Sequence, residues 1–217
     1  MKKGIDVSYC QDGMDFNAAA AAGATFCIVR AGRLGDSGTR YLDASFISNI
    51  NGAIAAGMKV GLYFYTKAMT VEQAAGDAAF MAAVIEEYCR GTDLAAGVWY
   101  DVEDGETTGT CDNETITAIC SRFICEMNDA GIKNVGIYSF YDWLANRIDT
   151  DELADYVPYW PASRRVNYFA AENPGKIVPI WQCANNWTDD VNSRKEIVYD
   201  GNVMYEDGDD PAAPVEG

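Results

Sequence analysis

The chain has 217 residues, 49% of them apolar, so it is long enough to bury a substantial core. Its formal net charge is -17, from 33 acidic and 16 basic residues, which argues against a nucleic-acid-binding face and against adhesion to an anionic membrane surface. Histidine is absent, which excludes Ser-His-Asp and Cys-His catalysis and histidine metal sites, so acid–base chemistry would fall to carboxylate, lysine or tyrosine side chains.

Strand-like and helix-like segments alternate over the first 148 residues. Strands are expected at 4–9, 25–32, 59–66, 97–103 and 134–140. Helices are expected at 15–24, 43–58, 70–89, 113–131 and 141–148. Five strand–helix units in succession indicate a parallel sheet with helices packed against it.

Two of these helices carry boundary signals. Asp43 is the predicted N-cap of the second helix, and Gly57 its C-terminal stop. Thr70 and Gln73 form the pattern of a capping box at the start of the third helix.

The alternation changes after residue 148. Three further strands are expected at 156–162, 177–183 and 196–202, with no helix of useful length between them. About eight strands in this order favour an α/β fold, a closed barrel whose final third is poor in helix. A doubly wound open sheet is the alternative, although no GxGxxG or phosphate-binding loop follows any strand.

The ends of the chain are read from composition. The first ten residues lack the apolar segment of a signal peptide, and no segment approaches the ~18 apolar residues of a membrane span. We expect one domain over residues 1–205. Residues 206–217 are acidic and rich in proline, alanine and glycine, which is typical of a tail or linker.

The seven cysteines lack the spacing of a zinc site or a CxxC redox motif. We therefore expect free thiols, no metal and no cofactor, while one disulfide within residues 111–125 remains an alternative for a protein that works outside a cell.

The stretch GVWYDVEDGE, residues 97–106, ends an apolar strand with two carboxylates. Asp101 and Glu103 are two residues apart, so their side chains leave the strand on the same side. In parallel barrels the active site lies at the carboxyl ends of the strands. Two neighbouring carboxylates resist joint ionisation, so one keeps its proton near neutral pH, as a general acid requires. This arrangement suits cleavage of a glycosidic bond.

Two more acids interrupt apolar runs. Asp6 lies within GIDVS and Asp200 within IVYDGNV. A lone carboxylate in such a run is costly unless it is paired or belongs to a site. We therefore expect four acids to converge on one barrel mouth, as catalytic residues.

Aromatic side chains near the same strand ends are expected to line a groove, because sugar rings stack their apolar faces on aromatic rings. Tyr63, Tyr138 and Trp160 are the favoured groove residues. The full set of expected substrate-binding residues is Tyr63, Tyr65, Tyr138, Trp160, Trp181 and Gln182.

An ordered set of motifs resembles a known family. GIDVSYCQ, GLYFYT, YDVED, GIYSF, PIWQC and YDGNV follow one another over residues 4–205 in the order found in glycoside hydrolase family 25. These are the Chalaropsis-type lysozymes, or N-acetylmuramidases, of bacteria and phage endolysins. The resemblance implies an irregular TIM-like (β/α)5(β)3 barrel and hydrolysis of the β-1,4 bond between N-acetylmuramic acid and N-acetylglucosamine in peptidoglycan.

The resemblance also implies roles for the four acids. Glu103 would be the general acid, and Asp101 would orient the N-acetyl group of the substrate or stabilise positive charge at the anomeric carbon. Asp6 and Asp200 would shape the electrostatics of the site. Whether the acetamido oxygen of the substrate or a water molecule attacks stays open.

The chain departs from the family pattern at positions expected to contact substrate. Arg30 stands where a lysine is usual, Tyr63-Phe64-Tyr65 lacks the usual histidine, and Cys10 replaces a tryptophan. The W-x-A-x-Y segment reads YWPASRR, with Pro161 intruding and Arg164 in place of the aromatic. These departures concern substrate preference rather than the four acids.

The implied partner is the peptidoglycan of a bacterial cell wall, reached outside the cell or after phage release. A wall-binding module beyond residue 217 would help so acidic a domain approach an anionic wall. Two alternatives remain, a non-catalytic glycan-binding module and a chitinase-like hydrolase, although the longer D-x-x-D-x-D-x-E motif of the latter is absent.

Overall fold

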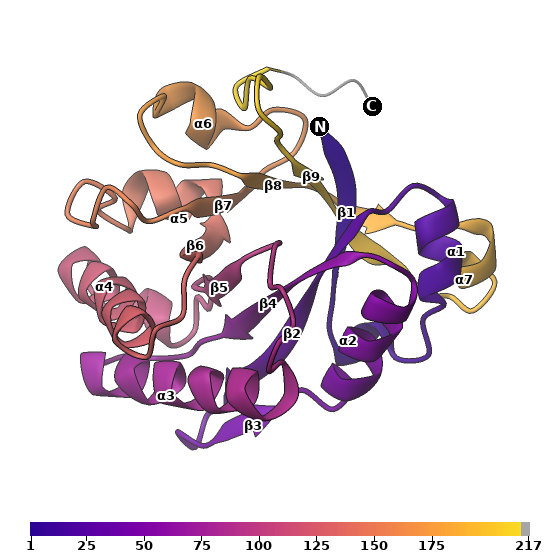
Figure 1. Ribbon diagram of the computed structural model, residues 1–217. Helices are drawn as coiled ribbons and strands as arrows, with labels where there is room; N and C mark the ends of the chain where they lie inside the picture. The colour runs from indigo at the N-terminus through magenta and orange to yellow at the C-terminus, as the bar shows by residue number, and fades with distance from the viewer. Residues whose placement is uncertain (214–217) are drawn as a thin grey trace.

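The computed structural model describes residues 1–213 and contains a barrel of strands surrounded by helices (Figure 1). The strands are β1 (Lys2–Val7), β2 (Phe26–Leu34), β3 (Arg40–Leu42), β4 (Lys59–Tyr65), β5 (Val98–Asp101), β6 (Val135–Phe140), β7 (Tyr159–Ala162), β8 (Ile180–Trp187) and β9 (Tyr199–Met204). The helices are α1 (Phe16–Ala21), α2 (Phe46–Ala55), α3 (Val71–Tyr88), α4 (Asn113–Asp129), α5 (Tyr141–Asn146), α6 (Tyr168–Glu172) and α7 (Asp190–Ser193).

The sheet closes on itself. Its strand order is β1-β9-β8-β7-β6-β5-β4-β2-β3, and pairing of β1 with β2 completes a barrel from which the short β3 hangs as a hairpin arm of β2. Five strand–helix units precede the last three strands, which confirms the predicted irregular (β/α)5(β)3 barrel. Only β9 runs antiparallel to its barrel neighbours, β8 and β1. Its amino end therefore lies at the edge where the other barrel strands end.

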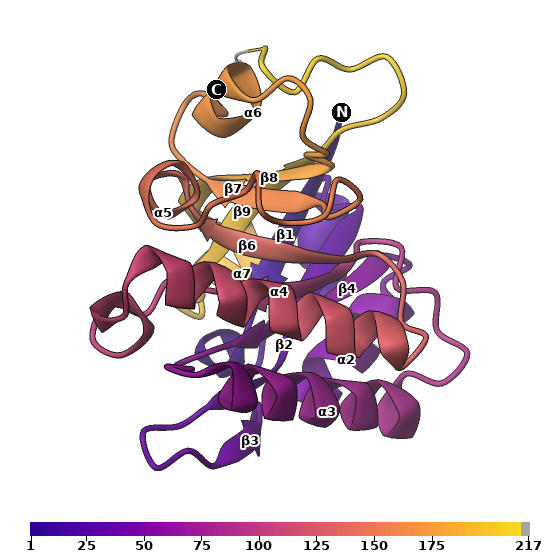
Figure 2. The same ribbon diagram turned by 90° about the vertical axis from the view of Figure 1, so that its left-hand side faces the viewer.

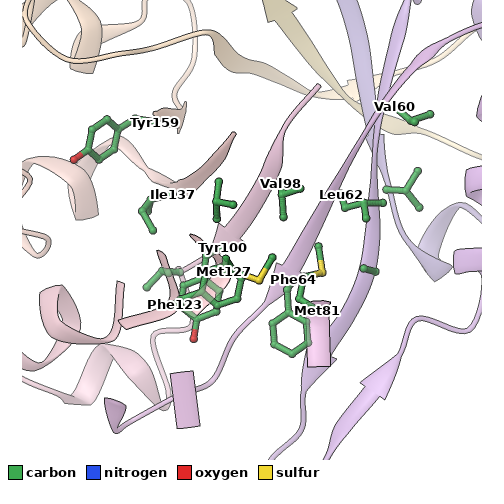
Figure 3. Packing of buried hydrophobic residues seen from close by; sticks show 14 of the residues in the cluster. Val60, Leu62, Phe64, Met81, Val98, Tyr100, Phe123, Met127, Ile137 and Tyr159 are labelled. Carbon is green, nitrogen blue, oxygen red and sulfur yellow. The ribbon is translucent and has the colours of Figure 1, made fainter. Parts of the chain in front are cut away.

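Alternation along the strands divides the core into two layers. Leu62 and Phe64 of β4 and Tyr100 of β5 face outward into the main core (Figure 3), where the Tyr100 ring stacks on Phe123 of α4 with 3.9 Å between ring centroids. Helices α3 and α4 lie side by side over this surface (Figure 2). The intervening strand positions, together with Ala96 just before β5, form a second cluster inside the barrel, composed of Phe26, Ile28, Ala96, Trp99, Tyr138, Trp160, Ala162 and Ile180.

The predicted N-cap of α2 is wrong. Ser45 precedes the helix, and the Asp43 carboxylate instead accepts a hydrogen bond from Arg30 Nε at 2.6 Å and from the Ser45 backbone N–H at 3.0 Å. The largely buried guanidinium needs a charge partner, because leaving it unpaired would cost more than a surface cap provides. Gly57 does end the helix, with a φ of 76° that suits glycine.

The capping box of α3 is half formed. Thr70 is the N-cap, and its hydroxyl accepts from the Gln73 backbone N–H. The Gln73 side chain accepts from the Met69 N–H at 2.7 Å instead of from Thr70.

The last three strands begin later than expected, at Tyr159, Ile180 and Tyr199. Proline precedes the first two at positions 158 and 179. Because proline cannot donate to a strand ladder, regular pairing starts only after it.

The segment after β9 returns to the amino terminus. The Met1 amino group lies 2.7 Å from an Asp209 carboxylate oxygen, and Lys2 Nζ lies 2.7 Å from Glu206 Oε1. The rest of the expected tail, residues 214–217, lies outside the described residues, so the boundary at 205 stays a prediction. No helix within residues 1–213 combines the length and apolar character needed to cross a membrane.

Gly136 makes room for the barrel floor. A Cβ at this position would lie 2.3 Å from the Pro158 carbonyl oxygen and 2.6 Å from the Trp99 ring. We expect Gly136→Ala to lower the free energy of unfolding by about 1–3 kcal/mol in urea titrations, because backbone must shift to admit the methyl group. Gly175→Ala is the matched control, since a Cβ there meets nothing within 4 Å. Equal stability of the two variants would contradict this packing.

Candidate active site

Four carboxylates meet at the carboxyl edge of the barrel. Asp6 lies in β1, Asp101 ends β5 with Glu103 two residues beyond, and Asp200 lies at the start of β9. Asp6 and Asp200 are directly opposite each other in the antiparallel β1–β9 ladder. A small cavity of about 70 Å³ opens between them, lined by Asp6, Tyr63, Asp101, Glu103, Tyr138, Trp160, Gln182 and Asp200.

Trp160 forms the floor of this cavity and is only 1% exposed. Its ring lies 4.5 Å from Tyr138 and 5.7 Å from Trp99, measured between centroids, and Tyr63 meets it edge-on at 6.3 Å. The indole N–H donates to Asn202 Oδ1 at 2.8 Å. These contacts fix the Trp160 ring at the bottom of the cavity. Because the ring is buried, it offers no open face on which a sugar could stack.

Two amides hold Asp6. Gln182 Nε2 and Asn202 Nδ2 donate to the same oxygen, Oδ2, at 2.9 and 2.7 Å. The amide oxygen of Gln182 accepts from the Tyr138 hydroxyl, and that of Asn202 accepts from Trp160. Because both amide oxygens are occupied by donors, both NH2 groups are turned toward Asp6.

Sequence reasoning missed Asn202, which is fully buried. The signal was available, because Asn202 lies two residues from Asp200 and therefore on the same side of the strand.

Few hydrogen bonds compensate for the burial of the Asp101 and Glu103 carboxyls. Asp101 is 4% exposed, and its Oδ1 atom has no hydrogen-bond partner among the described residues; the same is true of Glu103 Oε2. Burial, and then the charge of Glu103, raise the pKa of Asp101 well above its usual range. Burial likewise raises the pKa of Glu103 to about 7, with smaller contributions from Asp200 and Asp104 and with the Tyr138 hydroxyl opposing the shift.

The pKa values of Asp6 and Asp200 are raised as well. Burial raises the pKa of Asp6 to about 7, the charge of Asp200 adds to the shift, and the two amide donors oppose it. Burial also raises the pKa of Asp200. The cluster therefore keeps protons near neutral pH that isolated carboxyls would release. It can present a protonated acid and a carboxylate to the same small volume.

Arg30 supplies the positive charge next to the cluster. Its guanidinium pairs with Asp43 and lies 4.8 Å from the centroid of the Tyr9 ring. In the β2–β4 ladder, Arg30 is the register partner of Tyr63. Its charge lowers the pKa of Asp101, partly offsetting the effect of burial. Arg30 was noted in the sequence only as a departure from a family pattern.

Tyr65 was expected to bind substrate but lies outside the cavity lining. Its hydroxyl donates to Asp104 Oδ2 at 2.7 Å, and Asp104 also accepts from the backbone and hydroxyl of Thr107. Tyr65 therefore orders the loop that follows Glu103, and it remains half-buried at the rim.

Trp181 is also placed away from the cavity. It is 1% exposed, and its indole N–H donates to the carbonyl and hydroxyl oxygens of Ser163, both at 3.0 Å. Because adjacent residues of a strand point to opposite faces, Gln182 and Trp181 cannot both face the cavity. The structure thus brings to the cavity four of the six expected contact residues, namely Tyr63, Tyr138, Trp160 and Gln182.

The cysteines take no part in the site. All seven are free thiols, including the three within residues 111–125. Within residues 1–213, no group of three or more cysteine, aspartate or glutamate side chains is arranged to hold a metal ion.

A (β/α) barrel with a buried acid pair and aromatic walls at its carboxyl edge suits a glycoside hydrolase. The chain belongs to glycosyl hydrolases family 25, whose family model matches residues 5–191. No curated protein matches the chain by sequence.

Solved structures agree with this assignment. The modular autolysin LytC from Streptococcus pneumoniae is 25% identical, with a TM-score of 0.77 over 94% of this chain. This chain covers 46% of the length of that protein. A muramidase from Trichobolus zukalii is 20% identical, with a TM-score of 0.73 over 96% of this chain and 95% of its own. A bacterial lysozyme from Streptomyces coelicolor is 18% identical, with a TM-score of 0.71 over 95% of this chain and 93% of its own. These last two likenesses concern the fold.

The raised carboxyl pKa values predict how stability depends on pH. The folded pKa of Asp6 and of Glu103 is about 7, against ordinary values of 3.8 and 4.5, so between these limits the folded state binds more protons than the unfolded state. The free energy of unfolding should therefore fall as pH rises from about 4 to about 7. Urea titrations at several pH values would measure it.

Asp200→Asn removes a charge that raises both pKa values, so its stability should fall less over the same range. Asp93→Asn, at an exposed acid that forms no ion pair within residues 1–213, is the control and should follow the native chain. If the free energy of unfolding of the native chain instead rises from about pH 4 to about pH 7, the raised pKa values of these carboxyls would be contradicted.

Proposed function

We propose that this chain is a muramidase that hydrolyses the β-1,4 bond between N-acetylmuramic acid and N-acetylglucosamine, with Glu103 as general acid. The observation that carries the proposal is the Glu103 carboxyl, whose Oε2 atom is unpartnered and whose pKa is raised to about 7, in the same cavity as Asp101. The similar structures named as autolysin, muramidase and lysozyme support this choice of substrate.

In the proposed reaction, protonated Glu103 gives its proton to the glycosidic oxygen as the bond to the anomeric carbon breaks. Asp101 orients the N-acetyl group, and in its ionised form it stabilises the positive charge that develops at that carbon. Water then attacks the anomeric carbon, either directly or after the acetamido oxygen has first bonded to that carbon, in which case the water breaks that bond. Glu103 recovers a proton from the attacking water, so the cycle consumes one water molecule and leaves the enzyme unchanged.

Asp6 and Asp200 act on this pair through their charge. The two amides on Asp6 favour its ionised form, and Asp200 raises the pKa of Glu103. Of the two, Asp200 favours a proton on Glu103, the residue that must deliver it, while the charge of Asp6 raises the pKa of Asp101.

The proposal places the protein at a bacterial cell wall, outside the cell or after phage release. A wall-binding module following this chain would be consistent with the similar autolysin, which is described as modular.

Glu103→Gln tests the proposed acid. The amide keeps the shape of the side chain but has no acidic proton to transfer, so release of reducing ends from purified peptidoglycan should fall by about 10²–10⁴-fold. Muramic acid at the new ends, identified by mass spectrometry, would define the bond. Glu106→Gln is the control, because Glu106 is an exposed acid three residues away.

An unchanged melting temperature in both variants would show that the loss is chemical. Full activity in Glu103→Gln would remove the assignment, and binding to walls without reducing-end release by the native chain would favour a glycan-binding module. Cleavage of chitin oligomers but not of peptidoglycan would favour a chitinase-like enzyme.

The pH–rate profile tests the role of Asp200. Activity should decline as pH rises through about 7, where Glu103 loses its proton. Because the charge of Asp200 raises the pKa of Glu103, Asp200→Asn should move this descending limb of kcat/KM to lower pH. If the descending limb of Asp200→Asn lies at the same pH as that of the native chain, whatever the absolute rate, then Asp200 does not set the pKa of Glu103.

A further inference from the structure

A second hollow adjoins the acidic cavity at the same edge of the barrel. It has a volume of about 190 Å³ and lies between Phe140, at the end of β6, and Arg164, in the loop after β7. Gln182 lines both this hollow and the acidic cavity. The two hollows are therefore neighbours, on either side of one residue.

The loop that carries Arg164 is held firmly against the barrel. The Ser163 backbone N–H donates to the Gln182 carbonyl at 3.1 Å, and the Ser163 hydroxyl donates to the Val166 carbonyl at 2.8 Å. The Trp181 indole donates to Ser163 from behind. Arg165 has a φ of 70°, a strained value for a residue with a side chain, and such strain persists where surrounding contacts impose it. Arg164 is thus presented at the hollow by fixed backbone.

The charge of Arg164 is uncommitted. Acidic residues outnumber basic ones by 33 to 16, yet among residues 1–213 Arg164 forms no ion pair. Two other cations near the mouth are already paired, Arg30 with Asp43 and Lys67 with Asp36. Arg164 is exposed and lines the hollow. A guanidinium in this position is suited to a carboxylate.

The rest of the hollow suits a ligand that is partly apolar. The Phe140 ring is 46% exposed, Ala162 and Ala184 leave space beside it, and Asn185 adds an amide. Apolar and cationic walls facing each other fit a short aliphatic arm that ends in an anion.

We propose that this hollow binds the lactyl–peptide arm of the muramic acid residue that lies over the mouth of the acidic cavity, with Arg164 contacting a carboxylate of its peptide. This inference rests on the proposed function, because it takes the substrate to be peptidoglycan. Four acids at the cleavage site repel an anionic arm, and Arg164 provides compensation next to them. The methyl groups of the arm pack against Phe140.

The test compares two substrates. One is a soluble peptidoglycan fragment with free peptide carboxylates, and the other is the same fragment after carbodiimide coupling of those carboxylates to methylamine. The measured quantity is the ratio of kcat/KM for the free substrate to that for the amidated one. Arg164→Gln should lower this ratio by about two- to fivefold relative to the native chain, mainly through KM for the free substrate.

Arg165→Gln is the matched control, since it makes the same charge change one residue away at a side chain that does not line the hollow. It should keep the native ratio. If the ratio falls equally in both variants, the effect comes from the overall charge of the protein and not from a contact with Arg164. If the ratio is unchanged in Arg164→Gln, Arg164 does not contact the carboxylate. Either result overturns the inference. If the native chain releases no muramic acid ends from either substrate, the proposed function itself fails, and the inference fails with it.

Discussion

The site depends on placing carboxylates where water cannot fully solvate them and protein does not fully neutralise them. Asp101 and Glu103 each leave a buried oxygen without a partner, and Asp6 faces Asp200 across a strand ladder. A buried charge of this kind costs stability, and the chain keeps it only because the closed sheet holds the backbone in place. The raised pKa values are the direct consequence, and a proton held near neutral pH is what acid catalysis needs.

Side chains packed inside the barrel hold the buried acids in place. Trp99 and Trp160 fill the space beneath the acids, and Gly136 leaves the room that Trp99 requires. The indole N–H of Trp160 then fixes Asn202, which in turn holds Asp6. Packing below the site and ionisation within it are therefore linked by one hydrogen-bonded path, so a change in the floor would be expected to reach the acids.

Local sequence patterns predicted much of the fold and part of the site. Alternating strands and helices followed by three strands predicted the barrel, and the i, i+2 spacing placed Asp101 and Glu103 on one side. The same spacing rule was not applied to Trp181 and Gln182, where it allows only one to face the cavity, or to Asp200 and Asn202, where it brings both inward. The Arg30–Asp43 pair joins residues from separate elements, so no local signal distinguished Asp43 from a helix cap. The antiparallel course of β9, which brings Asp200 to the mouth, is a property of the closed sheet and not of the segment.

Charge creates a further problem that the fold has to solve. A chain of net charge -17 with four acids in its cavity would repel a substrate that carries carboxylates of its own. Spreading basic residues over the surface would weaken that repulsion everywhere, and would also lower the pKa of the acid that must keep its proton. A single guanidinium beside the cavity acts on the substituent of the sugar more than on the bond being cleaved. Arg164 occupies such a position, in a loop anchored by Trp181, so the tryptophan that does not reach the cavity still determines where a cation stands at its edge.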